Sequence, residues 1–438
     1  MTIAESPPLT VQNAPLPSGR DSAIDFLRAL CVVGVVLLHA IMVGVTVVDG
    51  SPVFENASDG TGWIVPVSWM LQVMPLFFII GGFAGFLARR RQRERGGSAS
   101  AFVAARVQRL VGPAVVTIGI VGAVLAMLSL AGVPAELVVV AGFRYGQPLW
   151  FLGVFLLCQS LLPMLASAHD RMPKTTLAAL VVAALAVDGL RAMTGVDGLG
   201  FLNLAFVWLA LQQIGFFLAD GTIGRLSRRC RVVGGAAAAA GLVATFTSGV
   251  YSPDLIANIN PPTGALLLVG VVHLSAVSLF RDRIDAFSRR PRAAAFAAFV
   301  NRRTMTIYLW HMPVLLGMAG LSAVAALATG MTLPEPSSVA WWLTRPLWLA
   351  TALALTAAAA VALTRFETRS SPAPTEAPRR VLGAVAAGLT AVVLLLVLGT
   401  TVLTATVAVI GMLWALRLAR PSHQTASGES VAHIVRVA

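Results

Sequence analysis

The chain has 438 residues, of which 57% are hydrophobic and only 12% are charged. A water-soluble domain usually carries about 25% charged residues, so this composition indicates a membrane protein and excludes a single soluble enzyme domain. The net charge of +13 does not indicate nucleic-acid binding, because the basic residues occur in short tracts between apolar segments. The three cysteines indicate no disulfide framework.

The N-terminal segment and the first apolar run differ sharply in composition. Residues 1–19 are rich in Pro, Ser, Thr and Asn without an apolar period, which predicts a disordered cytoplasmic tail. The run from Ile24 to Val48 is too long for the core of a signal peptide, so we expect it to remain in the membrane as the first helix.

Further apolar runs of spanning length follow along the chain. They are expected near 64–88, 110–131, 148–167, 175–190, 200–219, 233–250, 263–280, 304–327 and 346–364. With the first helix, these segments predict an all-α fold, a polytopic transmembrane bundle with a ten-helix core over 20–365.

Lysine and arginine are unequally distributed between the two ends of the predicted helices. With the N-terminus in the cytoplasm, the inner loops hold 24 Lys and Arg residues, and the outer loops hold only Arg144, Arg191 and Arg345. Because basic residues accumulate in cytoplasmic loops, the sequence predicts a multi-pass protein with a cytoplasmic N-terminus. Its richness in Ala and Arg favours the bacterial plasma (inner) membrane.

The C-terminal part of the chain predicts an appended membrane element. After a Ser/Pro/Glu linker over 366–380, the apolar stretch from Val381 to Leu416 would be about 54 Å long as one helix, whereas a bilayer core is about 30 Å thick. We therefore expect one or two helices over 381–417, and two fit better, with a turn near Gly399 to Thr401. A cytoplasmic tail is expected over 418–438.

The first predicted helix carries ionisable residues, which are costly in a bilayer unless they face protein or water. Arg28 and His39 are eleven residues apart, which places them on nearly one face at a rise of about 16.5 Å. A fixed cation then lies near the cytoplasmic rim and a titratable imidazole lies deeper, while Asp25 can pair with Arg28. The alternative is that Arg28 is a topology anchor and His39 packs between helices.

Two further arginines precede the third predicted helix. Arg106 and Arg109 are spaced i and i+3, so both lie on one helical face. Two guanidinium groups on one face suit a phosphate, which each can bind through two parallel hydrogen bonds. The alternative is a topology role only, because the loop before them is already basic.

Few other polar residues inside the predicted spans are candidates for a catalytic or binding role. Tyr308 and His311 are further candidates in the ninth span, although a histidine there more often packs between helices. The sequence has no metal-ligand spacing, phosphate-binding loop, nucleophile elbow or dinucleotide fingerprint. It therefore predicts no metal and no permanently bound cofactor.

Five segments, in this order and on these spans, together resemble the acyltransferase 3 family over about 20–365. They are Arg20 to Leu30 leading to His39, Met74 to Phe83, Arg106-x-x-Arg109, Pro148 to Leu152 with Trp150, and Thr306 to Pro313. One position departs from the family, since Gly81 stands where a Ser or Thr is common.

The resemblance implies a membrane O-acyltransferase that moves an acyl group, with acetyl expected, from cytoplasmic acyl-CoA as co-substrate. The implied acceptor is a hydroxyl of a glycan, a lipid-linked sugar or another hydroxylated molecule. On this reading Arg28, Arg106 and Arg109 hold the CoA phosphates, and His39 is either the general base or a transient acyl carrier. Asp25, Trp150, Tyr308 and His311 are secondary candidates.

Two other function classes remain as alternatives. A transporter or permease would also have ten or more spans and buried polar groups, but it would be expected to show inverted repeats with matching broken helices. No such repeat is clear in the sequence. The second alternative is a membrane scaffold without catalysis.

Overall fold

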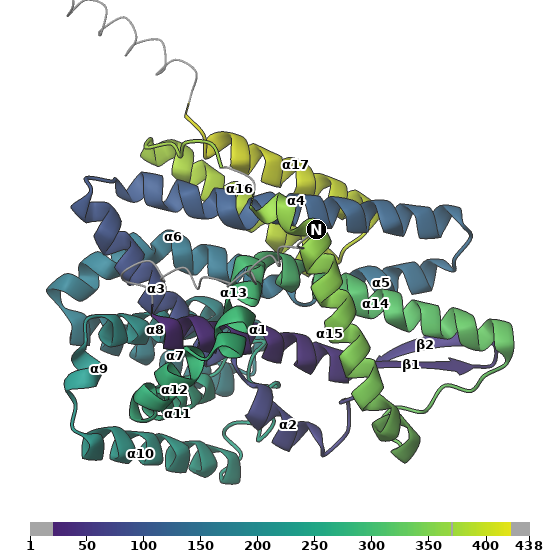
Figure 1. The fold of residues 1–438 in the computed structure, drawn as a ribbon, viewed down its shortest axis with the longest axis horizontal. Coiled ribbons are helices and arrows are strands. Elements are labelled where there is room, and N and C mark those ends of the chain that lie inside the picture. Colours follow the sequence, from purple (N-terminus) through teal and green to yellow (C-terminus); the bar gives the residue numbers. More distant parts are fainter. Residues whose placement is uncertain (1–20, 369–370, 422–438) are drawn as a thin grey trace, which may run out of the picture.

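The computed structural model describes residues 21–368 and 371–421 of the chain. This part is an all-α polytopic helix bundle, in which most long helices run roughly along one axis (Figure 1). Ten helices among the described residues are long and apolar enough to cross a membrane. The predicted fold class is therefore confirmed, and the protein is a multi-pass membrane protein.

Three of these ten spans consist of two consecutive helical segments, and the other seven are single helices. They are α1 (Ser22–Met42), α2 with α3 (Ile64–Leu71 and Met74–Glu94), α4 (Ala99–Leu130), α5 with α6 (Ala135–Gly146 and Leu149–Arg171), α7 (Pro173–Thr194), η1 with α8 (Asp197–Leu202 and Asn203–Ala219), α10 (Arg228–Thr247), α14 (Thr304–Thr329), α15 (Val339–Glu367) and α16 (Pro378–Leu398). Five further helices complete the described chain. They are α9 (Thr222–Arg225), α11 (Ala265–Leu279), α12 (Arg281–Ser288), α13 (Pro291–Arg302) and α17 (Val402–Leu418).

The first helix is shorter than predicted. It ends at Met42, and the segment expected to continue it forms strand β1 (Val43–Val48), which pairs antiparallel with β2 (Ser51–Asn56). The run is rich in β-branched residues, and it ends in Asp49 and Gly50, which both have positive φ and make the tight turn. The expected helix to Val48 is therefore wrong, because this local hairpin signal outweighs the apolar composition. The hairpin lies beside α14 at the right of Figure 1.

Other helix boundaries also differ from the sequence prediction. Helix α4 begins at Ala99, where the Ser98 side chain accepts a hydrogen bond from the Ala101 amide, so it starts well before the predicted residue 110. The predicted span over 263–280 corresponds to α11, which has 15 residues and bends by 70° into the polar helix α12. Helix α13 was not expected.

The C-terminal element consists of two helices. Residues 399–401 separate α16 from α17, and Thr401 and Thr404 cap the start of α17 reciprocally. The pair packs on α4 and α6 (Figure 1). The predicted tail over 1–19 and residues 422–438 of the predicted tail over 418–438 lie outside the described residues.

Close packing of α3 against α8 forms the centre of the bundle. A Cβ atom at Gly82 would lie 2.1 Å from the carbonyl oxygen of Gln212, and one at Gly215 would lie 2.1 Å from that of Ile79. Glycine at both positions lets the two backbones approach, which is a common device in membrane helix packing. This contact fixes the position of α3, whose neighbouring residues Gly81 and Gly85 line the cavity described below.

Candidate active site

A cavity of about 210 Å³ lies inside the bundle and brings the predicted site residues together. Of the eight candidates from the sequence, seven line it: Arg28, His39, Arg106, Arg109, Trp150, Tyr308 and His311. The eighth, Asp25, binds Arg28 directly. The lining extends from these arginines to Gln72 at the end of α2 and to Ile256 and Ile259 of the α10–α11 connection.

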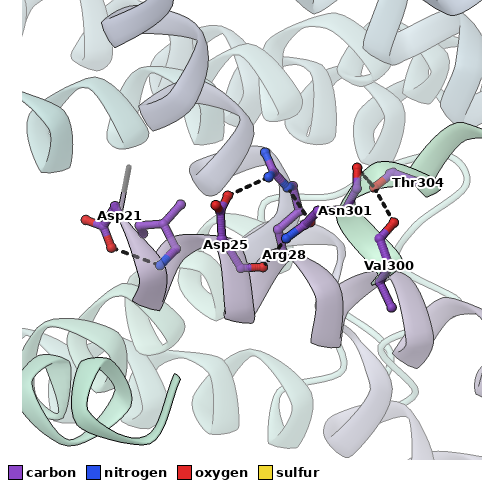
Figure 2. A network of polar contacts seen from close by, with 7 residues as sticks. Asp21, Asp25, Arg28, Val300, Asn301 and Thr304 are labelled. Atoms are coloured by element: carbon purple, nitrogen blue, oxygen red, sulfur yellow. Dashed lines mark hydrogen bonds and ion pairs between the residues drawn. The ribbon is translucent and has the colours of Figure 1, made fainter. Parts of the chain in front are cut away.

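Arg28 is held in place at one end of the cavity. Its Nη2 donates a hydrogen bond to Asp25 Oδ1 at 2.5 Å, and its Nε donates to Asn301 Oδ1 at 2.8 Å. The Asn301 amide in turn donates to the carbonyl oxygen of Asp25 at 2.8 Å, which closes the network between α1 and α13 (Figure 2). The guanidinium is therefore fixed in position where it borders the cavity.

Asn301 was missed by the sequence analysis. It is buried, with 8% of its surface exposed, and it lines the cavity together with Thr304, whose hydroxyl donates to the carbonyl oxygen of Val300 (Figure 2). The available signal was a single amide at the end of an apolar run rich in Ala and Phe. A buried amide needs hydrogen-bond partners, so its position predicts a polar contact but does not name Arg28 as the partner.

Arg106 and Arg109 face the same cavity from α4. Among the described residues, neither guanidinium makes a hydrogen bond or an ion pair, and Arg106 lies over the Phe102 ring at 4.8 Å from its centroid. No aspartate or glutamate is found among the described residues that line the cavity. Asp25 pairs with Arg28, so the charges of Arg106 and Arg109 leave this end with a positive potential that favours a polyanion.

His39 lies beyond the arginines on α1 and contacts His311 of α14. His311 Nε2 is 3.2 Å from His39 Nδ1, and the ring centroids are 5.0 Å apart. His39 is half-buried and lines the cavity, whereas His311 is fully buried. The sequence offered no way to pair these two side chains, which are 272 residues apart.

The contacts of this pair determine which ring nitrogens carry hydrogen when both rings are neutral. His311 Nδ1 is 2.6 Å from the carbonyl oxygen of Tyr308, so Nδ1 must donate and Nε2 is the acceptor. His39 Nδ1 then carries hydrogen and is shared between His311 and the carbonyl oxygen of Val35 at 3.0 Å. We therefore assign the lone pair of His39 to Nε2.

Tyr308 and Trp150 have structural contacts at the wall of the cavity. The Tyr308 hydroxyl donates to the carbonyl oxygen of Pro148 at 2.7 Å and accepts from the Leu152 amide at 3.2 Å, so it joins α14 to the start of α6. Trp150 stacks on Trp208 of α8 with ring centroids 5.6 Å apart. Both side chains thus fix the helices around the cavity.

The profile of the acyltransferase 3 family, described as an acyltransferase domain, matches residues 21–365. The chain belongs to the acyltransferase 3 family. No curated protein and no solved structure matches it. The matched region runs from α1 to the end of α15 and contains every residue that lines the cavity. The protein is therefore a membrane acyltransferase, with α16 and α17 beyond the family match.

Two details concern which groups this acyltransferase offers for chemistry. Gly81 lines the cavity beside the Phe155 ring, so this position supplies no hydroxyl to the site. Within the described part of the chain, no group of three His, Cys, Asp or Glu side chains is placed to hold a metal ion. Of the two imidazoles that line the cavity, His39 is the one whose Nε2 makes no hydrogen bond to another described residue.

Proposed function

We propose that the protein transfers an acyl group, with acetyl expected, from cytoplasmic acyl-CoA to a hydroxyl of a glycan, a lipid-linked sugar or another hydroxylated acceptor. The observation that carries this proposal is one cavity lined by three arginines at one end and by His39 further in. Acyl-CoA combines a polyanionic nucleotide with a thioester on a long arm, so it suits a positive entrance followed by a narrow interior.

The arginines bind the phosphates of the donor. Arg106 and Arg109 make no hydrogen bond or ion pair among the described residues, so both can form paired hydrogen bonds with phosphate oxygens. Arg28 adds a third charge whose direction is fixed by Asp25 and Asn301. Binding the phosphates at this end directs the thioester toward His39, about 16.5 Å further along α1.

His39 activates the acceptor in one of two ways. As general base, Nε2 takes the proton of the acceptor hydroxyl while its oxygen bonds to the thioester carbon, the carbon–sulfur bond breaks, and the CoA thiolate receives the proton. As nucleophile, Nε2 bonds to the thioester carbon, the carbon–sulfur bond breaks and CoA leaves as the thiolate. The acceptor oxygen then bonds to the acyl carbon, the bond to Nε2 breaks, and the hydroxyl proton is released through the freed Nε2, which balances the proton that the thiolate takes up. Both routes need the lone pair on Nε2.

The far end of the cavity admits the acceptor. Gln72 donates to the carbonyl oxygen of Leu255 at 2.8 Å, which holds the α10–α11 connection against α2 beside the cavity. Ile256 and Ile259 of that connection border the same space. In a bacterial plasma membrane with the arginine-rich end on the cytoplasmic side, the acceptor would enter from the outer side.

Purified protein incubated with radiolabelled acetyl-CoA tests this function. We expect label to leave acetyl-CoA for an acceptor or for the protein, and His39→Ala to lower this rate by at least about a hundredfold while the protein stays folded and inserted. Uptake of an intact solute into vesicles with no consumption of the thioester would instead indicate a transporter. Normal turnover by His39→Ala would remove the catalytic assignment.

A further inference from the structure

A second cavity, of about 660 Å³, lies at the arginine-rich end of the bundle. It is bordered by the C-terminal part of α8, by α9, by the start of α10 and by the junction of α11 with α12. Its lining includes Arg228, Arg231, Arg281 and Arg283, together with the apolar side chains of Leu218 and Phe280. It shares no lining residue with the first cavity.

Most of the positive charge in this second cavity is not neutralised. Arg281 pairs with Asp21, and Asp282 is the one lining carboxylate among the described residues. Arg228 and Arg283 are exposed, and no ion pair within the described chain involves either one. Two or more guanidinium groups are thus available to an anion.

Arg231 is held at the wall of the second cavity by a hydrogen bond. Its Nη1 donates to the carbonyl oxygen of Ser278 at 2.6 Å, which fixes the side chain between α10 and α11. Its Nε is buried and has no hydrogen-bond partner within the described residues. The side chain lines the cavity, so its charge adds to the positive potential there.

Two helices also begin at this cavity. Arg228 is the first residue of α10 and Arg281 is the first residue of α12, and both border the space. The amino-terminal end of a helix carries a partial positive charge, so both helices strengthen the attraction for an anion.

The surroundings identify the class of anion. Phe280, which is 48% exposed, borders the cavity. Only 11% of the residues in the apolar stretch of α10 are buried within the protein, so the rest of this stretch faces lipid. We propose that this cavity binds the phosphate of an acidic phospholipid headgroup, with the acyl chains lying along α10. A basic pocket next to apolar, lipid-facing side chains is typical of such sites.

Binding of a dansyl-labelled phosphatidylglycerol to the full chain in phosphatidylcholine nanodiscs tests the proposal, with tryptophan-to-dansyl energy transfer as readout. Arg228→Gln with Arg283→Gln should weaken binding by about tenfold or more, because each basic residue near the surface contributes about 1 kcal/mol. Neither residue makes a hydrogen bond that holds the fold within the described chain. The matched control is Arg379→Gln with Arg420→Gln, two exposed arginines that do not line the cavity.

Three results would overturn the proposal. The first is equal binding by the cavity variant and the control. The second is displacement of the lipid by free CoA at the concentration that saturates the active site, which would assign this cavity to the nucleotide of the donor. The third is displacement by millimolar inorganic phosphate, which would indicate a free-anion site. Lipid binding that is resistant to both competitors and weakened only in the cavity variant supports it.

Discussion

The hydrogen bond between His39 and His311 decides which ring nitrogen of His39 carries the lone pair. A neutral imidazole has one donor and one acceptor nitrogen, and the partner of one nitrogen decides the role of the other. His311 accepts from His39 Nδ1 because its own Nδ1 is committed to the carbonyl oxygen of Tyr308. We therefore propose that His311 is a positioning residue, which keeps the lone pair of His39 on Nε2.

Substitution of His311 tests this positioning role. His311→Leu removes the acceptor for His39 Nδ1 and should lower kcat by about a hundredfold, since misorientation of a catalytic group has effects of that size. KM for acetyl-CoA should change little, because the arginines are untouched. His311→Gln keeps an acceptor oxygen and should restore part of kcat. Equal loss in both variants, or a change in KM alone, would contradict this role.

Arg106 and Arg109 are expected to determine donor affinity. Arg106→Gln and Arg109→Gln should each raise the Kd for acetyl-CoA by about tenfold, because a charged hydrogen bond contributes about 1.5–3 kcal/mol. Isothermal titration at two salt concentrations measures this, and the wild-type affinity should fall at high salt. Arg95→Gln is the matched control, since Arg95 is exposed on the same side but does not line the cavity. Unchanged Kd in both variants would refute phosphate binding by these arginines.

At the scale of elements, the end of α1 shows a competition between two sequence signals. Its apolar composition predicts a helix to Val48, whereas the β-branched run followed by Asp49 and Gly50 predicts a hairpin. The hairpin forms, because residues at positive φ turn the chain back at once and β2 supplies hydrogen-bond partners for the strand. Apolar composition alone therefore locates a span but not its end.

The contact between α3 and α8 predicts a specific packing effect. Gly82→Ala would place a Cβ against the carbonyl oxygen of Gln212, and overpacking of this kind costs about 1–3 kcal/mol. We expect a lower midpoint of thermal unfolding in detergent, measured by tryptophan fluorescence. Gly317→Ala is the control, because a Cβ at Gly317 would meet no atom within 4 Å. A Gly82→Ala variant as stable as this control would show that α3 and α8 do not pack so closely.

At the scale of the whole molecule, one native cysteine reports the orientation. Cys31 and Cys158 are buried, whereas Cys230 is exposed near the start of α10, at the arginine-rich end. With that end in the cytoplasm, a membrane-impermeant maleimide should label Cys230 only after the membrane is disrupted. Ser51→Cys, in the hairpin at the opposite end, should be labelled in intact cells. The reverse pattern would invert the orientation.

The sequence by itself determined the class of fold and which site residues share a face of the same helix. Hydrocarbon admits only long apolar helices, so the apolar runs mark the spans, and the helical period places Arg28 and His39 on one face of α1. The i, i+3 spacing likewise places Arg106 and Arg109 together on α4. These are local properties, fixed by neighbours within a few turns.

Only the tertiary structure decided which helices bring these residues to a common cavity. Asn301 binds Arg28 across 273 residues, and His311 meets His39 across 272. The arginines of α10 and α12 converge on the second cavity in the same way. Such pairs depend on how helices pack, and packing is set by the fit of many side chains at once. No local pattern in the chain carries that information.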